Sequence, residues 1–467
     1  MLTRNFFVAG AAAVLLVGAT ALPAAALAAD DFGPIVEFAD SGYRPAIAAG
    51  PADGSALVVY AHYDRELDGD EIMGQFVSNE MEPIGAPFAV STPGGDDSYN
   101  APGVEWNADR QEWLVVWEQN TSESDVVAGR VVRPGVGSVG SEFVVAATYD
   151  GAGFTDLELA YAAFATDQDL YLVVFKATVN FDGECQAAFG VFVNSDGSVP
   201  STAATLLSLA TIGECTDDTQ VDNGANVDYS PASSRWLVGW YYRSQDEAAV
   251  SVQNIAGVVT PGTPTLVGEN TSSGHPTVTH DPSRDRFLLN WHHSTGANEL
   301  LRGALVTPAG ALIDTDFSIS GSDSRGDQRV ARVAYDPTAD LFLMVNHNQA
   351  NGDTDLERFV LLREMPASLG DPATNPEILS DPTVTAERPD IALAGDCVLV
   401  VWQWFAEGET EEDERWGVQG RSTCTTPELA ATGATDGTGA VWLGALFALI
   451  VGGALVTARR ARIADNA

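Results

Sequence analysis

The tetrapeptide Leu114-Val115-Val116-Trp117 decides the fold, because close variants of it recur along the chain. Seven copies begin 51 to 65 residues apart, which is roughly the length of one propeller blade. The other six copies are Leu57-Val58-Val59-Tyr60, Leu172-Val173-Val174-Phe175, Leu237-Val238-Gly239-Trp240, Leu288-Leu289-Asn290-Trp291, Leu343-Met344-Val345-Asn346 and Leu399-Val400-Val401-Trp402.

Three further short strands surround each copy in a fixed order. A first strand such as Pro45-Ala46-Ile47 is followed by a tight turn, clearest in Tyr335-Asp336-Pro337, where Pro sets φ and Asp caps the turn. The third strands share a glycine: Gly74, Gly129, Gly190, Gly303 and Gly420. The fourth strands centre on Phe88, Phe143, Leu207, Leu266, Phe317 and Ile378. The sequence therefore predicts an all-β, seven-bladed β-propeller over residues 29–424.

The two ends of the repeat region complement one another. The seventh unit has three strands, ending near Arg421, and no fourth strand follows them. Pro34-Ile35-Val36-Glu37-Phe38 has the character of a fourth strand and precedes the first unit. We therefore expect this N-terminal strand to complete the last blade and close the ring.

Four cysteines in an exported chain suggest disulfides, and four cysteines can pair in three ways. Cys185 starts a third strand and Cys215 follows the next fourth strand, so both fall at one end of an antiparallel pair. Cys397 opens a second strand and Cys424 closes the neighbouring third strand. This order favours the pairs 185 with 215 and 397 with 424.

The C-terminal tail combines a pentapeptide, an apolar run and a basic stop. Leu429-Ala430-Ala431-Thr432-Gly433 lies in a linker over residues 425–439, ahead of a predicted transmembrane helix over residues 440–458. A basic tail over residues 459–467 follows. Its arginines, Arg459, Arg460 and Arg462, would keep the tail on the cytoplasmic side of the membrane.

This order resembles the LAxTG sorting signal read by class E sortases of high-GC Gram-positive bacteria. The resemblance implies that a sortase cysteine attacks the Thr432-Gly433 bond and joins Thr432 to peptidoglycan. A plain C-terminal membrane anchor is the alternative interpretation.

The N-terminus agrees with export. Arg4 precedes an apolar stretch, and Ala26-Leu27-Ala28 offers the small-x-small pattern of a signal peptidase site. We expect residues 1–28 to be a signal peptide, Ala29 to start the mature chain, and the protein to lie at the cell wall.

The net charge of the protein limits the classes of molecule that it can bind. The chain has 23 basic and 65 acidic residues, a net charge of −42, and Lys176 is its only lysine. Nucleic acid is excluded as a partner, because phosphate binding needs a cationic surface. No cofactor is expected, although the carboxylates leave calcium open.

Long, acidic loops are expected on one face of the ring, here called the upper face, after the second and fourth strands. A ligand, glycan or protein, is expected to bind there, because loops on a rigid scaffold commonly carry binding residues. These loops are residues 62–71, 94–100, 213–224, 321–329 and 407–415. The opposite, lower face would then face the wall.

Candidate chemistry is sparse. His275, His280, His292 and His293 gather in the fifth unit, with His347 in the sixth, but His280 occupies a packing position shared with Trp106, Tyr229 and Tyr335. Asp64, Asp68, Asp70 and Glu71 could chelate calcium, without EF-hand spacing. Arg325-Gly326-Asp327 matches an integrin-binding tripeptide. No metal site is predicted.

The leading hypothesis is a wall-anchored binding or adhesion module without enzymatic activity. A carbohydrate-active hydrolase and a purely structural surface protein are the alternatives. The SxDxGxTW boxes of sialidase propellers are missing from the sequence, while paired carboxylates for glycoside hydrolysis remain open among the many acids.

Overall fold

The computed structural model describes residues 27–51, 54–64, 69–92, 98–120, 125–147, 154–181, 183–200, 204–208, 221–242, 247–254, 265–267, 273–294, 299–320, 327–349, 358–368, 376–406 and 415–424. These residues form one 3-10 helix, η1 (Ala29–Asp31), and seven four-stranded antiparallel sheets, each of which is a blade. The prediction of an all-β propeller is confirmed.

The blades follow one another along the chain. Blade 1 contains β2 (Gly42–Ala49), β3 (Ala56–Asp64), β4 (Gly69–Val77) and β5 (Pro83–Ala89). Blade 2 contains β6 (Ser98–Asn107), β7 (Glu112–Asn120), β8 (Asp125–Arg133) and β9 (Gly137–Ala147). Blade 3 contains β10 (Phe154–Ala165), β11 (Leu170–Phe181), β12 (Gly183–Asn194) and β13 (Thr205–Leu206). Blade 4 contains β14 (Val221–Ser230), β15 (Arg235–Tyr242), β16 (Glu247–Asn254) and β17 (Thr265–Leu266).

The remaining blades keep this pattern except at the junction of the chain ends. Blade 5 contains β18 (Ser273–Asp281), β19 (Arg286–Ser294), β20 (Glu299–Val306) and β21 (Leu312–Ser318). Blade 6 contains β22 (Asp327–Asp336), β23 (Leu341–Gln349), β24 (Arg358–Pro366) and β25 (Glu377–Ile378). Blade 7 contains β26 (Thr385–Ala394), β27 (Cys397–Ala406), β28 (Arg415–Ser422) and β1 (Val36–Ala39).

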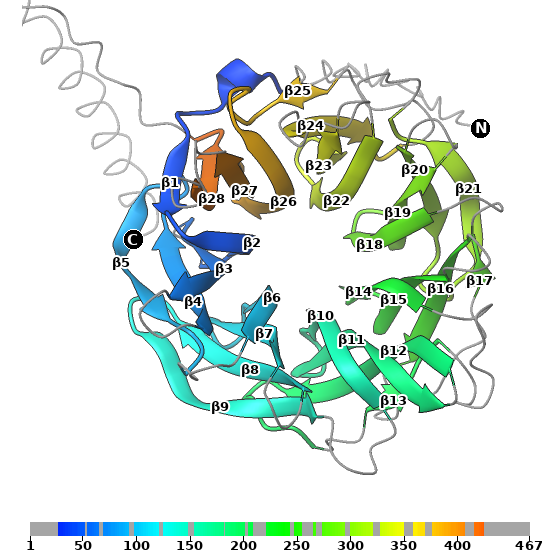
Figure 1. Cartoon of the computed structure of the whole chain (residues 1–467). Coiled ribbons are helices and arrows are strands. Elements are labelled where there is room, and N and C mark those ends of the chain that lie inside the picture. The colour runs from blue at the N-terminus through cyan, green and yellow to red at the C-terminus, as the bar shows by residue number, and fades with distance from the viewer. Residues whose placement is uncertain are drawn as a thin grey trace, which may run out of the picture. The chain divides into compact units, whose positions relative to one another are not determined.

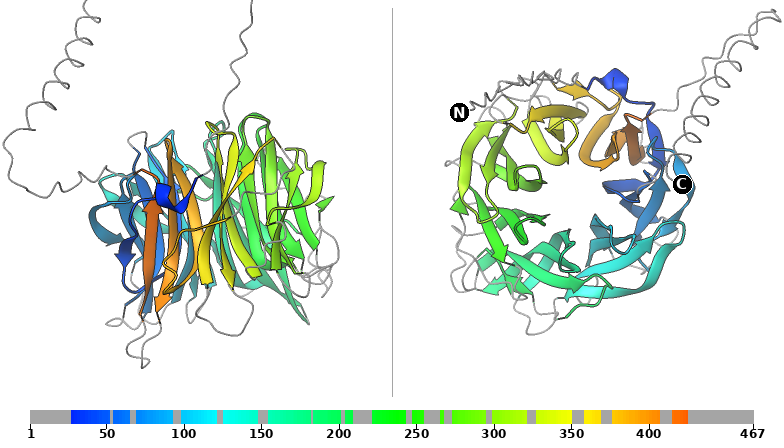
Figure 2. Two further views of the ribbon diagram at one scale, coloured as in Figure 1. Left: turned by 90° about the horizontal axis from the view of Figure 1, so that it is seen from above. Right: turned by 180° about the vertical axis from the view of Figure 1, so that it is seen from behind.

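The first strand of every blade lies at the centre of the ring. Figure 1 shows β2, β6, β10, β14, β18, β22 and β26 around the axis, with the later strands of each blade placed progressively outward. The strands run roughly along the axis, as the edge-on view of Figure 2 shows. Side chains of seven inner strands can therefore meet at the axis.

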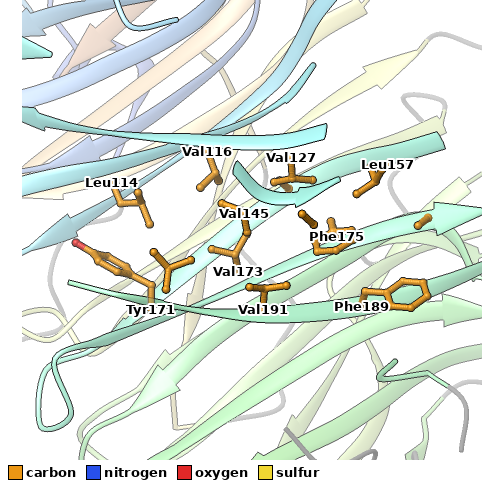
Figure 3. Packing of buried hydrophobic residues seen from close by; sticks show 14 of the residues in the cluster. Leu114, Val116, Val127, Val145, Leu157, Tyr171, Val173, Phe175, Phe189 and Val191 are labelled. Atoms are coloured by element: carbon orange, nitrogen blue, oxygen red, sulfur yellow. The ribbon is translucent and has the colours of Figure 1, made fainter. Parts of the chain in front are cut away.

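The recurrent tetrapeptide forms the core between blades. It lies in the second strand, and Leu114, Val116, Val173 and Phe175 are fully buried. Figure 3 shows side chains of blades 2 and 3 interdigitating, which buries the apolar faces that strand alternation creates.

The third-strand glycines make room for fourth-strand aromatics. A Cβ on Gly74 or Gly129 would lie 2.8 Å from the ring of Phe88 or Phe143, with which each glycine pairs. Blade 7 repeats this contact across the chain ends, because a Cβ on Gly420 would lie 3.0 Å from Phe38.

Ring closure by the N-terminal strand is confirmed. β1 pairs with β28 in antiparallel fashion, with Val36 opposite Gly420. Arg421 donates hydrogen bonds to the carbonyl oxygens of Gly33 (2.6 Å), Phe32 (2.9 Å) and Ala29 (3.1 Å). The Phe32 side chain is only 4% exposed. The segment before β1 is therefore a built-in part of the ring.

The disulfide between Cys397 and Cys424 is confirmed, with a Cα–Cα distance of 5.3 Å. Cys185 lies in β12, and its predicted partner Cys215 lies outside the described residues. In the described part of the chain, no helix is long and apolar enough to cross a membrane. The predicted signal peptide up to residue 26, the LAATG motif and the predicted span over residues 440–458 lie outside that part.

Candidate functional site

The inner strands share a β-bulge that directs side chains toward the axis. Each of the seven has a register shift against its second strand that leaves at least one extra residue on the inner strand. In six of them a left-handed residue, with φ between 44° and 84°, occupies the bulge: Arg44, Ala101, Leu159, Gly224, His275 and Arg388. A left-handed backbone conformation costs conformational energy in residues other than glycine, and such residues are concentrated at functional sites. The bulges are therefore candidate positions for a functional site.

A pocket of about 60 Å³ lies among these bulges, which is room for a few water-sized groups. Its polar lining comes from Arg44 of β2, Tyr161 of β10, Arg332 of β22, and Arg388 and Asp390 of β26. Its apolar walls are Pro45, Ala46, Ala101, Pro102, Leu159 and Pro389. Apolar walls with a few convergent polar groups are typical of ligand sites. We call it the axial pocket.

Three arginines concentrate positive charge in this pocket, although the chain as a whole has a net charge of −42. Among the described residues, no carboxylate lies within ion-pair distance of Arg44 or Arg332, and Arg388 has Glu387 at 3.8 Å. Burial and then the charge of Arg44 lower the pKa of Arg388. The arginines therefore repel one another and would be stabilised by an anion.

Tyr161 and Arg332 meet across the axis. Arg332 donates a hydrogen bond from Nη2 to the Tyr161 hydroxyl oxygen, and its Cζ lies 4.9 Å from the centre of the Tyr161 ring. Blades 3 and 6, which carry these residues, are separated by two blades on one side of the ring and three on the other. This contact joins distant parts of the ring at the pocket.

Asp390 is the acidic residue of the pocket lining. It accepts hydrogen bonds from the backbone N–H groups of Ile47 (2.9 Å) and Ile391 (3.0 Å). Burial raises its pKa, while the charge of Arg332 and these hydrogen bonds act in the opposite direction. Asp390 therefore joins blade 7 to blade 1 and offers a carboxyl group at the pocket wall.

One histidine packs between strands, and others lie near the axial pocket. The His280 ring packs at a tilt against Phe287 with ring centres 5.0 Å apart, as the Tyr229 ring does against Trp236 at 5.0 Å, which confirms its packing position. His275 lies 5.2 Å from His292, ring centre to ring centre. Burial, followed by the charges of His292, Arg332, Arg388 and His347, holds the pKa of His275 well below its usual range.

No cluster of three or more His, Cys, Asp or Glu side chains suited to a metal ion occurs in the described part of the chain. Asp68 and the first two residues of the Arg325-Gly326-Asp327 tripeptide lie outside that part. The calcium and integrin interpretations are therefore untested by the geometry.

The sequence predicts a ligand site in the upper loops, most of whose residues lie outside the described ones. The axial pocket is not among the predicted sites. A signal was present, because Arg44, Ala101, His275 and Arg388 each precede a proline at equivalent places in the repeat. Arginine at two of these places is notable in a chain so poor in basic residues.

No protein-family model matches this chain, and no curated protein matches its sequence. Solved structures similar to it include the NanB sialidase from Streptococcus pneumoniae, with 10% identity, a TM-score of 0.46, and coverage of 84% of this chain and 70% of that one. The phage phi92 endosialidase has 7% identity and a TM-score of 0.49, covering 88% and 71% of the two chains. The Trypanosoma rangeli sialidase has 9% identity and a TM-score of 0.44. The matched region covers 82% of this chain and 55% of the sialidase chain.

These structures correct one expectation from the sequence. We expected a protein without enzymatic activity, whereas the similar structures are named as enzymes, so that expectation is withdrawn. None of the comparisons supports adhesion. With TM-scores below 0.5, the likeness transfers no substrate or catalytic residue to this chain.

Proposed function

We propose that the protein is a carbohydrate-active propeller that takes the acid group of an anionic glycan in its axial pocket. The observation that carries this proposal is the convergence of Arg44, Arg332 and Arg388 on one pocket of a strongly acidic protein. Guanidinium groups match carboxylates in shape as well as in charge.

The rest of the pocket suits a sugar acid. Proline and alanine side chains form apolar walls beside the arginines, and Tyr161 adds an aromatic ring. A small inorganic anion would need only the charges, whereas a sugar acid also presents C–H groups to such walls. A protein exported to a bacterial surface, as the sequence predicts, works among polysaccharides.

Titration calorimetry of the protein with D-glucuronate, N-acetylneuraminate and neutral D-glucose tests this proposal. We expect Arg388→Gln to weaken binding of the acidic sugar by about tenfold to a hundredfold, the range for a lost hydrogen bond to a charged group. Arg284→Gln, which removes an arginine paired with Asp340 outside the pocket, is the matched control. Equal binding of glucose and the sugar acids would contradict the proposal.

Cleavage of the bound glycan is the second part of the proposal, with Asp390 as the candidate proton donor. Asp390 lines the pocket beside the arginines, and burial raises its pKa, which favours the protonated form that a proton donor needs. Release of 4-nitrophenol from acidic 4-nitrophenyl glycosides measures turnover. Loss of turnover in Asp390→Asn with retained binding would support this role, and binding without turnover in the wild type would restrict the function to binding.

We also propose that the protein acts at the cell wall, attached through Thr432. This part rests on the sorting-signal resemblance of residues 429–462 and on the predicted signal peptide.

A further inference from the structure

We propose that Tyr161 is a positioning residue that holds Arg332 in the geometry needed to bind an anion; the inference rests on the proposed function of the axial pocket. Arg332 is the pocket arginine whose guanidinium group is held by a side chain from another blade. Arg44 and Arg388 line the pocket from left-handed bulge positions, where the backbone conformation is fixed by the strand pairing on either side. Arg332 does not have a left-handed backbone conformation.

The register explains this difference. Arg332 pairs with Val345, two residues beyond the bulge position of its strand. Tyr161 pairs with Val174 at the equivalent position of blade 3. The equivalent residues of the other five inner strands are small or bond to a neighbouring blade: Ala46, Gly103, Asn226, Thr277 and Asp390. Tyr161 and Arg332 are the two large members, and they meet at the axis.

The contact leaves the guanidinium group available to a ligand. It uses Nη2 of Arg332 and the hydroxyl oxygen of Tyr161, while Nη1 lies 3.4 Å from the carbonyl oxygen of the adjacent Ala331. An arginine side chain has several rotatable bonds, and fixing it costs conformational entropy. Because the Tyr161 contact fixes Arg332 before the ligand arrives, binding avoids much of that cost.

A double-mutant cycle on glucuronate and N-acetylneuraminate affinity tests this inference. Tyr161→Phe keeps the ring and removes the acceptor oxygen, and we expect it to weaken binding by about tenfold without affecting D-glucose. Arg332→Lys keeps the charge and loses the planar fork. The double variant should bind no more weakly than Arg332→Lys alone, because Tyr161 then has no guanidinium to position.

Tyr229→Phe is the matched control, because the Tyr229 hydroxyl bonds to Asp167 outside the pocket. It should leave the affinity unchanged, and thermal unfolding should show Tyr161→Phe to be as stable as this control. Three outcomes would overturn the inference. The effects of the two pocket substitutions could be additive, the affinity could be unchanged in Tyr161→Phe, or the affinity could fall only together with the stability. If Arg388→Gln weakens binding while Tyr161→Phe does not, the proposed function stands and only the positioning role fails. If neither weakens it, or the wild type binds no acidic sugar, both fail.

Discussion

Polar side chains of the inner strands connect neighbouring blades through one repeated contact. Asp228 accepts the backbone N–H of His280 at 2.7 Å, and Asn226 accepts that of Val278 at 2.9 Å. Glu105 makes the same kind of contact to Phe164 at a longer 3.4 Å. Glu105 is partly buried, and a carboxylate with so weak a hydrogen bond is poorly compensated for its lost hydration.

Glu105 should therefore make stability depend on pH. Burial, with the charge of Asp228 adding to it, raises the pKa of Glu105 from 4.5 to about 8. Between these values the folded state holds a proton that the unfolded state has released, so wild-type stability falls as the pH rises. Glu105→Gln should remove this contribution and be more stable than the wild type at pH 9 by up to about 5 kcal/mol, the free energy equivalent of the difference between the two pKa values. Urea unfolding from pH 4 to 9 checks it, with the exposed Glu82→Gln as control; an unchanged slope in Glu105→Gln would refute the assignment.

The closing strand is the element on which the ring depends. β1 has four residues, and β28 would expose its outer backbone groups without it. Arg421 reinforces the closure, because it donates hydrogen bonds to carbonyl oxygens of the N-terminal segment. It also donates one to the carbonyl oxygen of Leu379, next to β25 of blade 6, at 3.1 Å. The segment from η1 to β1 is thus held by pairing, by burial of Phe32 and by this arginine.

Arg421→Met should loosen that segment. It keeps much of the side-chain volume and removes the donors, so we expect a loss of about 2–4 kcal/mol in unfolding free energy and faster proteolysis within residues 29–39. Denaturant unfolding and N-terminal sequencing of protease fragments measure the two effects. Arg130→Met is the control, because Arg130 also donates to two backbone carbonyls, those of Val90 and Gly140. Identical fragments from both variants would argue against a role in closure.

The elements were more predictable than the site. Each repeat carries its own strand signal, and the glycine opposite a fourth-strand aromatic recurs in blade 7 through Gly420 and Phe38. The axial pocket was harder to predict, because its residues come from five blades and side chains as different as Ala46, Tyr161, Arg332 and Asp390 occupy one position of the repeat. Whether Tyr161 and Arg332 meet depends on how the ring closes, which no local pattern specifies.

The C-terminal sorting signal predicts covalent attachment of the protein to the cell wall. Thr432→Ala should move the protein from the wall fraction to the membrane or the medium, because the proposed acyl donor is lost. Immunoblots of muramidase-released material measure this, with Thr435→Ala, three residues beyond the motif position, as control. Continued covalent attachment of Thr432→Ala to peptidoglycan would rule out this bond as the sorting site.

The pairing of β1 with β28 also sets an order of assembly. A ribosome makes Val36 early and its partner Gly420 almost last, so the first strand must wait for nearly the whole chain before it can pair. Contacts between such distant residues form late and slowly. Blades 1 to 6 can gather as they emerge, but blade 7, its disulfide and a closed axial pocket can form only when synthesis of the propeller is complete. A chain stopped short of β28 would therefore present arginines on its inner strands without the ring that brings them together.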